Sequence, residues 1–459
     1  MISVIRKRLG GSKRDVDMTE GNIFGHIIKF AIPLLLGNLL QQLYNMVDTW
    51  VVGNYVGSEA FSAVGTVGPI INMLISLFWG FSAGAGVVVS QYYGAKKYDK
   101  VSETVHTTLL VTVILGIVLT GVGIALVPTM LDLMNTPTEL LDEATEYLTV
   151  YFSGLIGLVV YNIGSGILRA VGDSRRPFYF LAVSALTNTV LDLVFVLAFN
   201  MGVKGVALAT IIAQGLSAVL ILITLCRSDN CIKVSFGKLK IHKDELFKII
   251  KVGLPVALQM IVTSFSNVFV QAYINYFGAN AMGGWTAYAK IDQLILLPMQ
   301  SIALASTTFV GQNLGNDDVK RAKKGVNASL LLAVSVTVLI MIPILIFAPQ
   351  LVYFFNKDGE IISYGAIFLR TLTPFYVLCC VNQIYAGALR GSGNATAPMI
   401  IMLVSFVGFR QLYLYVMATF ISNTPIPIAL SYPAGWLVCS AVMFIYYKTV
   451  KLEKGRIVK

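Results

Sequence analysis

Long apolar runs separated by short polar segments cover almost the whole chain. A helix needs about 20 apolar residues to cross the ~30 Å hydrocarbon core of a bilayer. Twelve runs reach that length, so the pattern predicts an all-α membrane protein with twelve transmembrane helices and both termini on one side. The predicted spans cover residues 26–51, 61–90, 105–128, 143–166, 178–200, 205–226, 249–276, 282–310, 326–348, 362–386, 398–420 and 427–447.

The first span carries a polar face. Asn38, Gln41, Asn45 and Asp48 follow each other at spacings of three and four residues, so they lie on one side of a helix. A charge inside a span costs about 2.5–3.5 kcal/mol and is rarely kept without a partner or a function. We expect this face to line a water-filled cavity. The alternative is an Asp48 side chain that is solvated among the lipid headgroups.

Further polar residues occupy the fifth and sixth predicted spans. Asp192 lies about 12 Å from the outer end of its span, at ~1.5 Å per residue, and Asn188 precedes it by one turn. Thr210 and Asp48 fall at a similar depth, so the four side chains can converge. Two carboxylates, an amide and a hydroxyl suit Na⁺, and two neighbouring carboxylates equally suit a shared proton. Hydrogen bonding between helices is the structural alternative, above all for Thr210.

Composition and charge support a membrane protein. The 459 residues are 56% hydrophobic and 12% charged, about half the charged fraction of a soluble domain. The net charge of +11 therefore indicates basic cytoplasmic loops, and we expect no nucleic-acid partner. The five cysteines show no metal or redox spacing. The first 20 residues lack the apolar core of a signal peptide, so the first span is the expected insertion signal.

The basic residues predict the orientation and the domain limits. With a cytoplasmic N-terminus, 28 of the 34 lysines and arginines fall on the cytoplasmic side, and only Lys204 and Lys357 fall in outer loops. This bias predicts that both termini are cytoplasmic. The expected segments are a basic N-terminus 1–25, an N-lobe 26–226, a basic linker 227–248, a C-lobe 249–447 and a basic tail 448–459.

The second half of the chain repeats the first. Two halves with the same orientation must be related by an axis along the membrane normal. We therefore expect two pseudo-symmetric six-helix bundles that face a central cavity, an architecture typical of alternating access. The matched residues are Leu168–Arg169 and Leu389–Arg390, Gly172 and Gly393, Pro177 and Pro398 at an offset of 221, and Pro33 and Pro255, Asn45 and Asn267 at 222.

The charges inside the apolar runs differ between the halves. Asp48 and Asp192 have no charged counterpart in the second half, which instead carries Lys290, Asp292, Arg370 and Arg410. Lys290 and Asp292 are two residues apart and cannot face each other on a helix. Either of them can pair with Arg370 or Arg410 across helices, and substrate contact fits these charges equally well.

Motifs for other kinds of chemistry are missing. We expect no H-E-x-x-H zinc motif, no G-x-S-x-G serine nucleophile and no nucleotide-binding P-loop, and no cluster of His, Cys or Ser nucleophiles at one depth. We therefore expect a transporter that uses an ion gradient, not an enzyme, and no cofactor besides the coupling ion H⁺ or Na⁺.

Several runs resemble bacterial multidrug and toxic compound extrusion (MATE) transporters over almost the whole chain. The runs are MTEGNIFGHIIKFAIPLLLGNLLQQLYNMVDTWVVGNYVG, SQYYGAKKYD, NTVLDLVF and ILRAVGDSRRP, together with ALRGSGNATAP, which is the counterpart of the last run in the second half. The resemblance implies a two-lobed antiporter of the bacterial inner membrane, acting as a monomer among membrane lipids. It would export small, often cationic organic compounds in exchange for H⁺ or Na⁺. The alternative function is a lipid-linked oligosaccharide flippase of a related fold, which predicts a more cationic cavity.

The resemblance also assigns roles to residues of the first half. The coupling site for H⁺ or Na⁺ matches Asp48, Asn188, Asp192 and Thr210. Gln41, Tyr44, Tyr147 and Asn162 fall at positions that resemble the N-lobe substrate pocket, and Pro33 matches the proline at which the first helix is proposed to bend. Members with C-lobe carboxylates differ from this chain, which has Thr263 and Cys379 at those positions. Lys290 and Arg410 are therefore expected to admit zwitterionic or anionic substrates.

Overall fold

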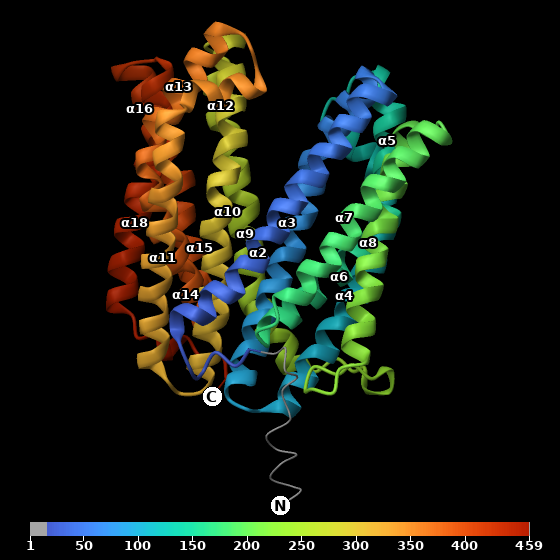
Figure 1. Cartoon of the computed structure of the whole chain (residues 1–459), viewed down its shortest axis with the longest axis vertical. Coiled ribbons are helices and arrows are strands. Elements are labelled where there is room, and N and C mark those ends of the chain that lie inside the picture. Colours follow the sequence, from blue (N-terminus) through green and yellow to red (C-terminus); the bar gives the residue numbers. More distant parts are fainter. Residues whose placement is uncertain (1–15, 459) are drawn as a thin grey trace, which may run out of the picture. The chain divides into compact units, whose positions relative to one another are not determined.

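The computed structural model describes residues 16–458, and its helices form two compact units (Figure 1). Within the described residues, unit 1 contains Pro33–Gly253 together with Val16 and Asp17, and unit 2 contains Met18–Ile32 and residues 254–458. The predicted lobes began at residues 26 and 249, so the observed division falls at different residues. The basic residues Arg6, Lys7, Arg8, Lys13, Arg14 and Lys459, which contributed to the predicted orientation, lie outside the described part.

Unit 1 is a bundle of long helices that pack along their lengths. Helix α3 packs against α4, α5 and α6, and α8 packs against α5, α6 and α7. In lipid the backbone polar groups must be satisfied within each segment, so apolar runs of this length form helices. The elements are α2 (Ile23–Val51), η1 (Val52–Val56), α3 (Ser58–Gly94), α4 (Tyr98–Leu133), α5 (Thr138–Ser153), α6 (Leu155–Ala170), α7 (Arg175–Leu193), η2 (Val194–Ala198), α8 (Gly202–Cys226) and η3 (Phe236–Lys238).

Unit 2 has the same kind of architecture. Helix α10 packs against α11, α13 and α14, and α14 packs against α18. The elements are α9 (Lys243–Asn275), α10 (Ala279–Gly315), α11 (Val319–Ile346), α12 (Ala348–Phe355), α13 (Gly359–Leu372), η4 (Thr373–Phe375), α14 (Tyr376–Ser392), α15 (Thr396–Leu403), η5 (Val404–Phe409), α16 (Arg410–Val416), η6 (Met417–Ile421), α17 (Pro425–Ala429), α18 (Ser431–Thr449) and η7 (Leu452–Gly455).

The helices confirm the predicted twelve-span fold. Within residues 16–458, eleven helical stretches are long and apolar enough to cross a membrane, and the bent pair α5–α6 brings the number to twelve. The span predicted over 143–166 corresponds to this pair, within which the chain bends by 49°. Gly154 lies at this break, and a Cβ added to it would stand 2.2 Å from Cβ of Ile211 on α8.

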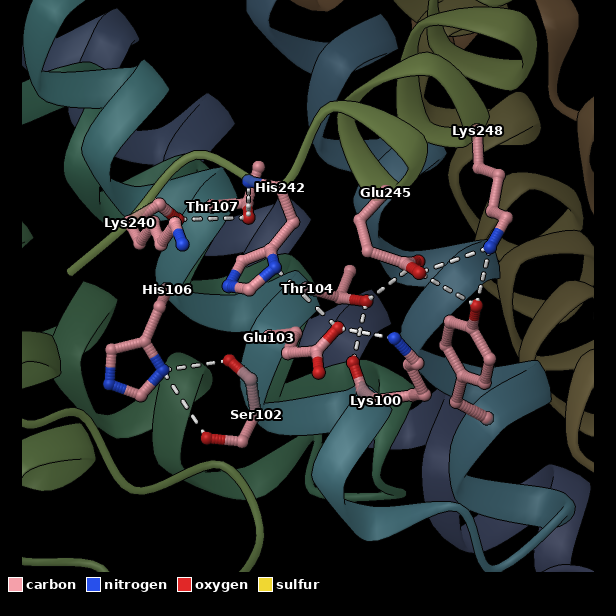
Figure 2. Close-up of polar contacts among 11 residues, drawn as sticks. Lys100, Ser102, Glu103, Thr104, His106, Thr107, Lys240, His242, Glu245 and Lys248 are labelled. Atoms are coloured by element: carbon pink, nitrogen blue, oxygen red, sulfur yellow. Dashed lines mark hydrogen bonds and ion pairs between the residues drawn. The ribbon is translucent and has the colours of Figure 1, made fainter. Parts of the chain in front are cut away.

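The linker between the halves is fastened to unit 1 (Figure 2). Glu245 is buried and accepts hydrogen bonds from Tyr92 Oη at 2.9 Å and Lys248 Nζ at 3.0 Å. His106 Nε2 accepts a bond from the Ser235 backbone N–H at 3.0 Å. These contacts tie the segment 235–248 to the end of α3 and the start of α4, so α9 begins within unit 1.

Helix α9 also packs tightly on α3 along the stretch from Ile249 to Gly253. A Cβ at Gly84 would lie 2.3 Å from the backbone oxygen of Ile249, and a Cβ at Gly253 would lie 2.8 Å from that of Gly80. Glycine is required on both sides for this approach, since backbone atoms cannot move away as a side-chain tip can. Helix α9 leaves unit 1 directly after this contact.

The segment before α2 is fastened to unit 2 in a comparable way. The Met18 backbone N–H donates to Gln312 Oε1 at 3.0 Å, and Asn313 Nδ2 donates to the Met18 oxygen at 3.2 Å. Arg321 Nη2 donates to the Glu20 oxygen at 2.7 Å. Residues of unit 2 thus bind the segment that precedes α2, and residues of unit 1 bind the segment that precedes α9. The boundary between the units falls next to Pro33 in α2 and next to Pro255 in α9.

Candidate functional site

Two aspartates meet inside unit 1. Asp192 of α7 is fully buried, Asp48 of α2 is half-buried, and their carboxyl groups lie within hydrogen-bonding reach of each other. Both carboxyl oxygens of Asp192 and Oδ1 of Asp48 have no hydrogen-bond donor among the described residues. Two ionised carboxylates cannot donate to each other. A shared proton or a bound cation would therefore satisfy this pair.

Asn188 and Thr210 extend the polar site across α7 and α8. Asn188 is buried, and its Nδ2 donates to Thr210 Oγ1 at 3.5 Å. The Thr210 hydroxyl donates its own proton to the Val206 oxygen at 3.0 Å. Its Oγ1 is therefore free to accept the hydrogen bond from the Asn188 amide. Asn188 Oδ1 has no donor within the described chain, which leaves one more oxygen for a cation. Clusters of three or more His, Cys, Asp or Glu side chains that could hold a metal are absent from residues 16–458.

Tyrosines surround the acidic pair. Tyr44 and Tyr147 lie within electrostatic reach of Asp48, and Gln41 hydrogen-bonds to Tyr44. Tyr147 stacks on Tyr151 with ring centroids 6.2 Å apart. Three of the four predicted pocket residues thus lie beside the pair. Sequence reasoning missed Tyr151, although its spacing of four from Tyr147 on one helix could have revealed it.

Asn162, the fourth predicted pocket residue, bonds to the backbone of its own helix α6. Its Nδ2 donates to the Leu158 oxygen at 2.8 Å, and its backbone oxygen accepts from Ser82 Oγ at 2.9 Å. Ser82 belongs to Gly80–Gly84, which has the G-x-S-x-G spacing, so the expected absence of this motif is wrong. Hydrolases place this motif on a turn between strand and helix, whereas here it lies inside α3. It therefore joins α3 to α6 and offers no nucleophile.

Pro33 lies inside the continuous helix α2. It is also the first α2 residue that groups with unit 1. Proline removes one helical hydrogen bond and weakens the helix locally. Bending at Pro33 remains a prediction, and its position at the change of unit is consistent with it.

Arg410 is the largest fully buried side chain of unit 2, and neutral groups hold it. Its Nη2 donates to Ser266 Oγ at 2.6 Å and to Asn267 Oδ1 at 2.9 Å, while Nε donates to the Phe406 oxygen at 3.1 Å. Its guanidinium carbon lies 4.8 Å from the ring centroid of Tyr432. The buried cation thus links α16 to α9 and faces an aromatic ring.

The other charges of unit 2 do not pair with Arg410. Tyr288 donates to Asp292 Oδ1 at 3.4 Å, and Tyr376 also donates to this oxygen. Lys290 and Arg370 are exposed. Across the described residues, no ion pair joins any two of Lys290, Asp292, Arg370 and Arg410. Of the two alternatives that the sequence leaves open, ion pairing is not seen among these described residues, where tyrosine hydroxyls donate to Asp292 instead.

A family model described as MatE matches the chain twice, over residues 33–194 and 255–416. The two matches are offset by 222 residues, which agrees with the repeat found in the sequence. Together they cover well over half of the chain.

Several curated proteins align with nearly all of the sequence. "Probable multidrug resistance protein YoeA" of Bacillus subtilis is 27% identical over 93% of this chain and 93% of its own length. "Probable multidrug resistance protein NorM" of Thermotoga maritima is 26% identical, with the same two coverages. "Multidrug export protein MepA" of Staphylococcus aureus is 22% identical over 84% of this chain and 85% of its own.

Solved structures share the fold. A Pyrococcus furiosus transporter of the MOP superfamily superposes with a TM-score of 0.90 at 24% identity, over 95% of this chain and 98% of that chain. A MATE family multidrug resistance transporter described as outward-facing gives the same values. These likenesses support the arrangement of helices.

Proposed function

Because the chain belongs to the MatE family, we propose that it exports small organic compounds and that H⁺ or Na⁺ binding at Asp48 and Asp192 drives the export. The transporters among its relatives support this transport function. The observation that carries this proposal is the facing pair of carboxyl groups, three of whose four oxygens have no donor within the described residues. A buried carboxylate is rarely kept in a membrane span without a function.

Coupling follows from binding preferences. If the ion binds one conformation of the transporter more tightly and the organic compound binds the other, entry of the ion weakens the hold on the compound. Asn188 and Thr210 complete an oxygen-rich site around the pair, and Tyr44 and Tyr147 supply aromatic surface for an organic cation. We propose that cation and compound compete for the same negative charge in unit 1.

The setting of the transporter follows from its charges and its relatives. Both termini would lie in the cytoplasm of a bacterium, because the basic residues gather on that side. A single chain already holds two bundles, so a monomer suffices. The named relatives are multidrug resistance and export proteins, which does not favour the flippase alternative. The acidic interior of unit 1 also differs from the cationic cavity that a flippase predicts.

Proteoliposomes test the proposal. Purified protein is reconstituted with a cationic fluorescent dye, and a pH gradient and a sodium gradient are imposed separately. We expect dye transport with at least one gradient, and its loss in Asp48→Asn and Asp192→Asn. The matched control is Asp132→Asn, which removes an exposed aspartate at the end of α4. Gradient-driven transport by both site variants at the wild-type rate would refute the coupling site.

A further inference from the structure

One side of helix α9 is exposed from the first residue of the helix onward. Lys243, Phe247 and Lys251 follow each other at intervals of four residues, so they lie on one side of the helix, and all three are exposed. The exposed Leu254 and Leu258 continue this side along the same helix. Lys243–Asn275 is long and apolar enough to cross a membrane, and lipid tails cover the outer apolar side of such a helix. The two lysines therefore lie where a lipid-facing surface begins.

The end of the linker and the start of α9, residues 236–251, form a segment that is basic on its exposed side. Phe236 and Phe247 in this segment are 74% and 68% exposed. Within residues 16–458, none of its exposed lysines lies within 4.0 Å of a carboxylate. The exposed charged residues are Lys238, Lys240, Lys243, Asp244 and Lys251. We call residues 236–251 the basic segment.

The other side of the basic segment is bound to unit 1 (Figure 2). Thr107 Oγ1 donates to the Lys240 oxygen at 3.2 Å and accepts from the His242 backbone N–H at 3.0 Å. Glu245 is buried and bonded to Tyr92 and Lys248. These bonds fix the backbone of the segment, so a ligand of its exposed side chains does not have to order the chain.

The first half of the chain keeps one of these lysines. Lys29 of α2 matches Lys251 at the offset of 222 residues and is also exposed. It is followed by the exposed Ile32 and Leu36, which match the two exposed leucines of α9. An exposed lysine at the start of an exposed apolar side thus occurs in both copies of the repeat, so it belongs to the duplicated framework and not to one loop.

We propose that the basic segment binds anionic phospholipids of the surrounding leaflet, with Lys243 and Lys251 on the headgroup phosphates and Phe247 in the interface. Lysine side chains near the end of a span extend into the headgroup layer, and a cluster of basic residues next to a span attracts anionic lipid. The exposed lysines outnumber the one exposed carboxylate of the segment, so its charge complements such a surface. The proposal does not depend on the export function, because none of these residues belongs to the acidic pair.

Photoreactive lipids test the contact. The full-length protein is placed in nanodiscs of phosphatidylcholine that contain either phosphatidylglycerol or phosphatidylcholine with a diazirine in the acyl chain, at the same mole fraction. After illumination, mass spectrometry of the digested protein measures the labelling of residues 236–258 by each lipid. One lysine near an anionic surface changes binding about fivefold. We therefore expect phosphatidylglycerol to label the wild type at least about fivefold more than phosphatidylcholine does, and Lys243→Gln with Lys251→Gln to remove most of this preference.

Two control variants separate this contact from a general effect of charge. Lys243→Arg with Lys251→Arg keeps both charges and should keep the preference. Lys96→Gln with Lys357→Gln removes two exposed lysines outside the basic segment and should leave the preference unchanged. Size-exclusion profiles establish that each variant is folded, and the ratio measured on the wild type tests the proposal without any variant.

Three results would overturn the proposal. The first is equal labelling of the segment by the two lipids in the wild type, and the second is an equal loss of preference in the variant at Lys96 and Lys357. The third is labelling of the segment by neither lipid while other lipid-facing helices are labelled, because water or another protein would then cover the segment.

Discussion

Replacing Asp192 by asparagine should abolish ion-driven export and, at high pH, stabilise the folded protein. Asparagine has nearly the same shape, and its Nδ2 can donate to the carboxylate of Asp48. When both carboxyl groups of the wild type are ionised they repel each other by about 4 kcal/mol at ~4 Å and an effective dielectric constant of ~20. Asp192→Asn removes this repulsion and leaves a hydrogen bond in its place.

The sign of the effect depends on pH. At low pH the wild-type pair can hold a proton and is satisfied, so the two proteins should unfold at similar temperatures. As the pH rises the proton leaves, and the variant should gain stability relative to the wild type by up to a few kcal/mol. If Na⁺ is the coupling ion, sodium at one hundred times its dissociation constant should raise the free energy of unfolding of the wild type by about 2.7 kcal/mol.

Thermal unfolding of both proteins in detergent, across pH and with or without sodium, measures this difference. The same preparations are then assayed for dye transport in proteoliposomes. Unfolding temperatures that differ equally at every pH, together with intact transport by Asp192→Asn, would refute a shared cation between the two aspartates. Asp132→Asn serves again as the control, because it removes an exposed carboxylate and should follow the wild type throughout.

The remaining predictions concern residues around the site. Gly84→Ala should lower the unfolding temperature, because its Cβ would lie 2.3 Å from a backbone oxygen, whereas Gly65→Ala, with nothing within 4 Å, should not. Glu245→Gln weakens the charged hydrogen bonds that hold the linker and should cost about 1–3 kcal/mol of stability, seen by thermal unfolding and by faster proteolysis after Arg227. Asn162→Ala should leave dye transport within about twofold of the wild type, since its amide bonds only to its own helix and such changes are usually small; a large loss would place it in the pocket.

Hydropathy predicted the spans because the length of an apolar run alone decides whether a helix can cross a bilayer. The bend at Gly154 was not predictable, since apolar residues continue through it and the close approach of Ile211 comes from a distant part of the chain. The meeting of Asp48 and Asp192 followed from helical spacing and depth. The grouping of residues 18–32 with unit 2 could not be predicted from the sequence either, since it depends on contacts with Gln312 and Arg321, about 300 residues further along the chain.

The two repeats explain why coupling is proposed for unit 1 alone. Ser266 and Asn267, which hold Arg410, match Tyr44 and Asn45 at the offset of 222 residues, one helical turn before Asp48. Unit 2 thus carries a permanent positive charge beside the helix whose counterpart in unit 1 carries a carboxylate. That charge repels a second small cation, which cannot exchange there as it can between two acids. Under the proposed coupling, the duplicated framework would therefore offer an exchangeable cation site in unit 1, while Arg410 is a fixed cation in unit 2.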